Sequence, residues 1–140
     1  MRIEHDLIIH ADIERVWALT VDVESWPSVT PTMTTVERLD HGAFGVGSRA
    51  RIVQPRQRPR VWTVERLDAP HVFVWSARLG PLTMTGGHEL AATPDGTLNR
   101  LTLDVTGPGS GLFGRLAGRQ LLAAIRTENE GFRRVAEQSG

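Results

Sequence analysis

The sequence contains no cysteine, no tyrosine and no lysine. Without cysteine the chain has no disulfide bond, no thiolate nucleophile and no Cys-ligated metal site. Without tyrosine it also lacks a common acid–base side chain, so few residue types remain for proton transfer. The five histidines are dispersed and show no metal-ligand spacing, and no glycine-rich phosphate loop is present. We therefore expect no metal ion and no cofactor.

An excess of charge and long hydrophobic runs are also missing. Sixteen arginines balance sixteen acidic residues, for a formal net charge of zero. This balance gives no long-range attraction to nucleic acid or an anionic membrane surface. No apolar run approaches the roughly 20 residues that span a bilayer, and the charged start, residues 1–6, is unlike a secretory signal peptide. We expect a cytoplasmic protein that neither binds nucleic acid nor inserts into a membrane.

The chain has the size and composition of a single domain, residues 1–140, with 40% hydrophobic residues. Its beginning predicts a strand over residues 2–10 and a short helix over 11–19, for which Asp12 is a suitable N-cap. A second brief helical turn is expected over 22–27, ended by Pro27.

The middle of the chain shows strand patterns separated by turn residues, with no helical periodicity before residue 112. The expected strands cover residues 32–40, 47–54, 60–67, 71–78, 83–93 and 97–107. A long amphipathic helix is then expected over 112–138. Short connections favour antiparallel neighbours, and a sheet of this length curls and needs a cover on its apolar side. The predicted fold is α+β: a curved antiparallel sheet of about seven strands wrapped on the long C-terminal helix.

Several short motifs occur in a characteristic order. They are Ile9-x-Ala11-x3-Arg15-Val16-Trp17, Asp22-Val23-Glu24-Ser25-Trp26-Pro27, Gly45-Val46-Gly47-Ser48-Arg49, Gln54-Pro55, Trp62-x-Val64-x3-Leu67-Asp68, Phe73-x-Trp75, Gly87-His88-Glu89-Leu90, Gly96-Thr97 and Gly107-Pro108. In this order they resemble the START-like (SRPBCC) superfamily of helix-grip proteins, in particular its polyketide cyclase/dehydrase-like group. The resemblance covers nearly the whole chain and implies a ligand pocket between sheet and helix. It does not imply one activity, because the superfamily includes both enzymes and carriers.

His88 is the one candidate for a catalytic base. A two-residue turn at Asp95-Gly96 would place His88 opposite Leu103, on the covered face of the last hairpin. A buried histidine there would be mostly neutral and able to exchange a proton. The alternative is a structural histidine, hydrogen-bonded to the backbone or to a buried water.

The other candidate ligand-binding residues share apolar or aromatic character and a position expected to face the cavity. Aromatic rings offer flat walls to a planar ligand, although each could equally be ordinary core. The set comprises Trp26, Trp62, Val64, Phe73, Trp75, His88, Leu90, Leu101, Leu103, Phe113, Leu116 and Gln120.

Two functions of the cavity remain open at this stage, and a third option, an interaction module, would instead require a filled cavity and an exposed apolar patch. One is binding of a small hydrophobic or aromatic molecule, polyketide-like or lipid-like, which needs only a shaped apolar cavity. The other is a cyclase, aromatase or dehydrase reaction in which His88 or a bound water moves a proton. The small supply of acid–base groups favours binding. The protein is expected to be a monomer or a homodimer.

Overall fold

Seven antiparallel strands form one curved sheet in the order β1-β7-β6-β5-β4-β3-β2. A computed structural model describes residues 1–138 of the chain. All expected strands are present, with ends that differ by a few residues from the expected ranges. Their bounds are β1 Arg2–Ile9, β2 Thr35–Arg38, β3 Arg49–Val53, β4 Arg60–Asp68, β5 Val72–Leu79, β6 Leu82–Thr93 and β7 Gly96–Thr106.

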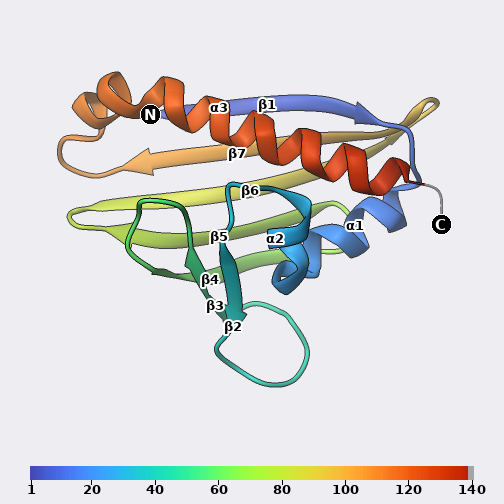
Figure 1. Ribbon diagram of the computed structural model, residues 1–140, viewed down its shortest axis with the longest axis horizontal. Helices are drawn as coiled ribbons and strands as arrows, with labels where there is room; N and C mark the ends of the chain where they lie inside the picture. Colours follow the sequence, from blue (N-terminus) through green and yellow to red (C-terminus); the bar gives the residue numbers. More distant parts are fainter. Residues whose placement is uncertain (139–140) are drawn as a thin grey trace.

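The long C-terminal helix lies lengthwise across one face of this sheet (Figure 1). It packs against β1 and β7, and its second half also contacts the two short helices that follow β1. The helical elements are α1 Ile13–Val21, η1 Val23–Ser25, α2 Trp26–Val29 and α3 Ser110–Glu137. The prediction of an α+β helix-grip fold is therefore confirmed. No helix within residues 1–138 is both long enough and apolar enough to cross a membrane.

Pro27 does not end a helix, and this part of the prediction is wrong. It lies in the first turn of α2, which continues to Val29. Proline is tolerated there because the first N–H groups of a helix have no partner within the helix. The tight succession of η1 and α2 instead directs the Trp26 side chain into the core, where it is 3% exposed.

The register of the β6–β7 hairpin also differs from the prediction. Thr93 pairs with Gly96, so Pro94 and Asp95 form the turn, and His88 pairs with Leu101. The register has moved by two residues, and a shift of two leaves every side chain on its predicted face. Gly96 has φ +139°, and a Cβ there would lie 2.2 Å from the carbonyl oxygen of Ile9.

Aromatic side chains fill the core where α2, the sheet and the second half of α3 meet. The Trp26 ring centroid lies 5.8 Å from that of Phe132 on α3 and 5.2 Å from that of Trp75 on β5. Phe73 packs against Trp75 at 4.9 Å. This packing fills the interior beneath the last turns of α3, around Phe132.

Candidate functional site

A cavity of about 210 Å³ lies between the sheet and α3. Its helical wall comes from residues spaced three or four apart along one face of α3. Its other walls come from α2, the loops beside β2 and β3, and strands β3 to β7. The lining residues are Trp26, Met33, Ile52, Gln54, Gln57, Trp62, Trp75, Met84, Gly86, Gly87, His88, Leu101, Thr102, Leu103, Ala117, Gln120, Leu121, Ala124, Ile125 and Glu128.

Three tryptophans form an aromatic wall of this cavity. Trp62 lies on β4 and Trp75 on the neighbouring strand β5. Both side chains point to the covered face of the sheet, since residues at alternate positions of a strand share one face. Their ring centroids are 5.7 Å apart, and Trp26 lies 5.2 Å from Trp75. Gly86 lies directly beneath, since a Cβ there would be 3.5 Å from Trp75 and 3.6 Å from Trp62. The absence of a side chain at Gly86 leaves both indole rings room beside the cavity.

His88 lies on the covered face of β6, as predicted, and is 6% exposed. Its ring stacks on Phe73 at 5.5 Å and lies 5.6 Å from the ring of Phe132. Burial among these rings lowers the pKa of His88 to about 4, so the imidazole is neutral at pH 7. The buried Nδ1 atom has no hydrogen-bond partner among residues 1–138. The backbone bond expected for a structural histidine is therefore absent at this nitrogen.

Glu128 is the other ionisable residue among those that line the cavity. Its side chain is half-buried, and Oε1 accepts a hydrogen bond of 3.0 Å from the Thr32 hydroxyl. Burial raises the pKa of the Glu128 carboxyl to about 7, and the bond from Thr32 offsets part of that increase. The carboxyl therefore lies near the midpoint of its titration at neutral pH.

The sequence prediction missed Glu128, although its position carries a signal. It follows Ala117, Gln120, Leu121 and Ala124 on the same helical face, at spacings of three and four. A charged residue on a covered face is unusual and marks a candidate functional group.

Seven of the residues expected in the site line the cavity: Trp26, Trp62, Trp75, His88, Leu101, Leu103 and Gln120. Five others do not: Val64, Phe73, Leu90, Phe113 and Leu116. Val64, Phe73 and Leu90 are buried in the core, where neighbouring side chains separate them from the open space. Phe113 is partly buried against the same core.

Leu116 shows that the expected buried face of the helix was wrong at this position. Its side chain is 77% exposed. The cavity-facing residues run from Ala117, and Leu116 lies one position outside that face. One residue corresponds to about 100° of helix rotation, so a small error in phase moves a side chain from the cavity to solvent.

A buried hydrogen-bond cluster next to Glu128 fixes the rotation of α3. Asn129 accepts a bond of 2.8 Å from the Asn99 side-chain amide and donates one of 3.0 Å to the His5 carbonyl oxygen. Both asparagines are fully buried. These bonds join α3 to β7 and β1, and they hold the adjacent Glu128 toward the cavity.

Comparison with known proteins places this architecture in a family. The profile described as "Polyketide cyclase / dehydrase and lipid transport" matches residues 1–137. The chain belongs to this family. The resemblance inferred from the sequence motifs is therefore confirmed. No curated protein matches the chain.

Several solved structures share the fold of this chain at low sequence identity. The protein TTHA0849 from Thermus thermophilus is 20% identical, with a TM-score of 0.78 over 99% of this chain and 100% of that one. The di-domain ARO/CYC StfQ from the steffimycin biosynthetic pathway is 14% identical, with a TM-score of 0.80 over 98% of this chain. The di-domain ARO/CYC BexL from the BE-7585A biosynthetic pathway is 22% identical, with a TM-score of 0.73 over 96% of this chain. This chain covers 50% of StfQ and 45% of BexL, about half of each di-domain protein.

Proposed function

We propose that this protein binds a small hydrophobic or aromatic molecule in the cavity between the sheet and α3. The observation that carries the proposal is the cavity walled by Trp26, Trp62 and Trp75. Indole rings give a large contact area at a low entropic cost, and they suit planar ligands. The family includes lipid transport in its description, which supports a binding role.

The size of the cavity narrows the class of ligand. Pockets for drug-sized molecules typically occupy about 300–1,000 Å³. At about 210 Å³ this cavity is smaller. It therefore suits a compact ring system better than a long extended chain.

Filling the cavity tests this proposal. Ala124 lines the cavity, whereas its neighbour Ala123 is exposed on the outside of α3. We expect Ala124→Phe to weaken binding of naphthalene, measured by isothermal titration calorimetry, by about tenfold or more, because the new ring would occupy the ligand's space. Ala123→Phe is the matched control and should bind as the wild type does.

Equal affinity in the two variants would place the binding site elsewhere and refute the proposal. Native mass spectrometry of the purified protein provides an independent test. A retained small molecule that is lost in Ala124→Phe, and kept in Ala123→Phe, would identify the natural ligand by its mass.

A cyclase, aromatase or dehydrase activity is the second candidate function. His88 favours it, because its buried imidazole, whose Nδ1 has no hydrogen-bond partner within residues 1–138, belongs to the lining of a cavity that could hold a reacting carbonyl compound. The two ARO/CYC structural neighbours support the same idea. However, a histidine with a pKa of about 4 is a weak proton acceptor at pH 7, and general-base catalysis is most efficient near the operating pH. Binding is therefore the function that the geometry supports better.

His88→Ala distinguishes the two functions. If His88 is the base, the variant should lose at least about a hundredfold in turnover of a polyketone substrate while its ligand affinity changes little. Turnover that is unchanged in this variant would remove His88 from the mechanism.

A further inference from the structure

The lining of the cavity includes polar side chains that binding of a purely hydrophobic ligand leaves unexplained. Gln54, Gln57, Gln120 and Glu128 all line the cavity, in addition to the aromatic wall. A hydrocarbon in the cavity would remove water from the amide and carboxyl groups without replacing their hydrogen bonds. Such desolvation costs free energy, so the polar groups point to a ligand with a polar substituent.

The hydrogen bonds around Glu128 show which of its atoms is available. The Thr32 hydroxyl donates to Glu128 Oε1, so in its 2.9 Å contact with Thr30 Oγ1 it acts as the acceptor. The Thr32 backbone N–H in turn donates to Thr30 Oγ1 at 3.3 Å. This short chain of bonds holds one carboxyl oxygen. Within residues 1–138 the other oxygen, Oε2, receives no hydrogen bond from the protein.

His88, another lining residue, also carries an unpartnered polar atom. The His88 Nδ1 atom is buried and has no partner within the described chain, although its ring is enclosed by Trp26, Phe73 and Phe132. Buried polar atoms normally have partners, and exceptions often mark functional sites. The cavity thus combines an aromatic wall with Glu128 Oε2, an oxygen that no residue of the described chain hydrogen-bonds.

We propose that Glu128 Oε2 binds a hydroxyl group on the ligand, so that the cavity selects a small hydroxylated aromatic molecule over the corresponding hydrocarbon. The inference rests on the proposed binding function and specifies its ligand class. A hydroxyl group suits this position because it can donate to a carboxylate and accept from a carboxylic acid. Gln54 is positioned to support the contact, since its side-chain amide donates to the Thr32 carbonyl oxygen at 3.3 Å and holds the same loop.

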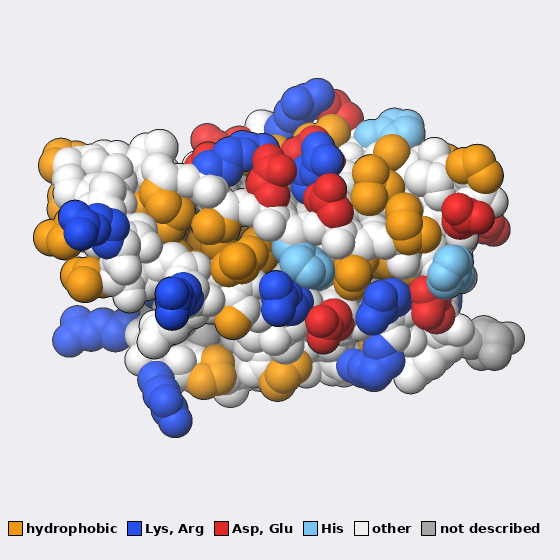
Figure 2. Space-filling view, turned by 90° about the horizontal axis from the view of Figure 1, so that it is seen from above, with side chains coloured by type: hydrophobic (Ala, Val, Ile, Leu, Met, Phe, Trp, Pro, Cys, Tyr) orange, Lys and Arg blue, Asp and Glu red, His pale blue; other side chains and the backbone are white. Residues whose placement is uncertain are grey.

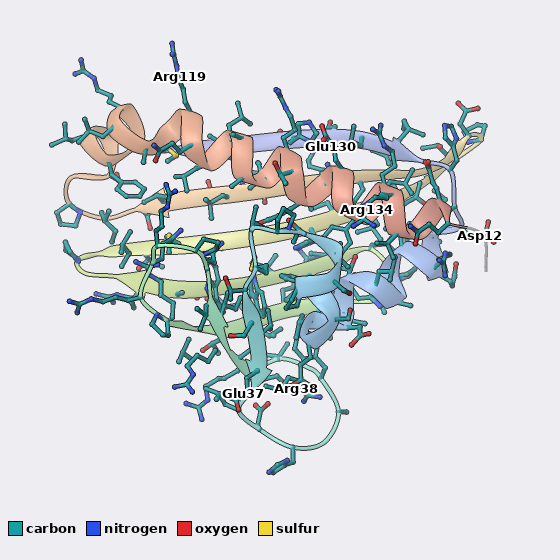
Figure 3. All side chains as sticks on the ribbon, viewed as in Figure 1. Asp12, Glu37, Arg38, Arg119, Glu130 and Arg134 are labelled. Carbon is teal, nitrogen blue, oxygen red and sulfur yellow. The ribbon has the colours of Figure 1, made fainter. Side chains whose placement is uncertain are left out.

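The test compares two probes, 2-naphthol and naphthalene, in four proteins. These are the wild type, Glu128→Leu, Glu128→Gln and the control Glu130→Leu. Glu130 is exposed on the same helix and is not among the residues lining the cavity, and Figure 3 labels it for comparison. Dissociation constants are measured by isothermal titration calorimetry, and thermal unfolding confirms that each variant is folded.

We expect the wild type to bind 2-naphthol more tightly than naphthalene. Glu128→Leu should weaken 2-naphthol binding by about 10–100-fold, the usual effect of losing a hydrogen bond to a charged group, and leave naphthalene binding unchanged or tighter. Glu128→Gln keeps a hydrogen-bonding oxygen and should stay within about fivefold of the wild type. Glu130→Leu should alter neither affinity.

Two different failures can be told apart. If the wild type binds naphthalene, and Glu128→Leu leaves the ratio of the two affinities unchanged, the hydroxyl inference is refuted while the aromatic cavity stands. If the wild type binds neither probe, the proposed function fails, and this inference fails with it.

Discussion

The two halves of α3 differ in how deeply their side chains are buried. All five buried residues of this helix, Ile125, Asn129, Gly131, Phe132 and Ala136, lie in its second half. The first half carries Leu112 and Leu116 exposed to solvent, and none of its residues is buried. In Figure 2 hydrophobic side chains are visible at the left end of the molecule, the end where α3 begins in Figure 1, and also across the rest of this face.

This contrast shows that a single helix can be packed tightly against the core at one end and more loosely at the other. The second half is held by close packing and by the Asn129 hydrogen bonds. Residues of both halves, from Ala117 to Glu128, cover the cavity, but the first half has no buried residue, and regions with few buried contacts open at low free-energy cost. Ligand access is therefore expected beneath the first half of α3.

Truncation of a side chain in each half should produce the largest difference. Phe132→Ala removes a fully buried ring that contacts Trp26 and His88, and should cost about 3–5 kcal/mol of unfolding free energy. Leu116→Ala should change it by less than about 0.5 kcal/mol, because that side chain is already in solvent. Urea unfolding followed by circular dichroism measures both values. Similar losses in the two variants would contradict the division of the helix.

Adding a methyl group at a glycine in each half should give effects of opposite sign. A Cβ at Gly131 would lie 2.2 Å from the carbonyl oxygen of Val29, so Gly131→Ala must displace α2 and should cost about 3 kcal/mol. At Gly118 nothing lies within 4 Å of the added Cβ. There alanine should stabilise by about 0.5–1 kcal/mol through its helix propensity. Urea unfolding of both variants measures the two changes in unfolding free energy. A stabilising Gly131→Ala would show that α3 is not closely packed against α2 there.

The two ionisable groups that line the cavity, His88 and Glu128, should change the unfolding free energy with pH by smaller amounts and in opposite directions. The folded pKa of His88, about 4, is below its usual 6.5, so the folded state binds fewer protons than the unfolded state. Its stability contribution is lost as pH falls from about 6.5 to about 4, by at most about 3 kcal/mol. His88→Phe should reduce this acid loss. An acid loss as large as that of the wild type would show that His88 is not the group responsible.

Glu128 acts in the opposite direction, since its folded pKa is raised from 4.5 to about 7. The folded state then binds more protons, and unfolding free energy decreases as pH rises through this interval. Glu128→Gln should flatten the decrease between pH 5 and pH 8, measured by urea unfolding at each pH. A decrease that persists in the variant would assign it to another group.

Much of the fold could be predicted because its signals are local. Alternating strands, turn residues and the long amphipathic helix appear directly in the residue pattern. The error at Pro27 came from the two roles that proline has near helices, as a stop and as a first-turn residue. The error at the β6–β7 turn was harmless to the site, because a shift of two residues kept His88 on the covered face.

The candidate site was less predictable because it depends on which residues meet across the sheet. The aromatic wall was found from strand alternation, yet Phe73 and Val64 proved to be packed core instead of lining. The helical wall was partly missed, since the rotation of α3 is set by Asn129 and by the contact between Gly131 and Val29. Those contacts join residues about 30 to 100 positions apart, and no local pattern encodes them.

The sequence by itself determined the order of strands and helices, the covered face of each strand, and the family to which the chain belongs. Only the tertiary structure decided that a cavity remains under the middle of α3, from Ala117 to Glu128, and that Phe132 fills the space under its last turns. It also decided that Glu128 and His88 both line that cavity. The reason is that side-chain periodicity is a property of a few neighbouring residues, whereas a cavity is what remains after distant elements have packed.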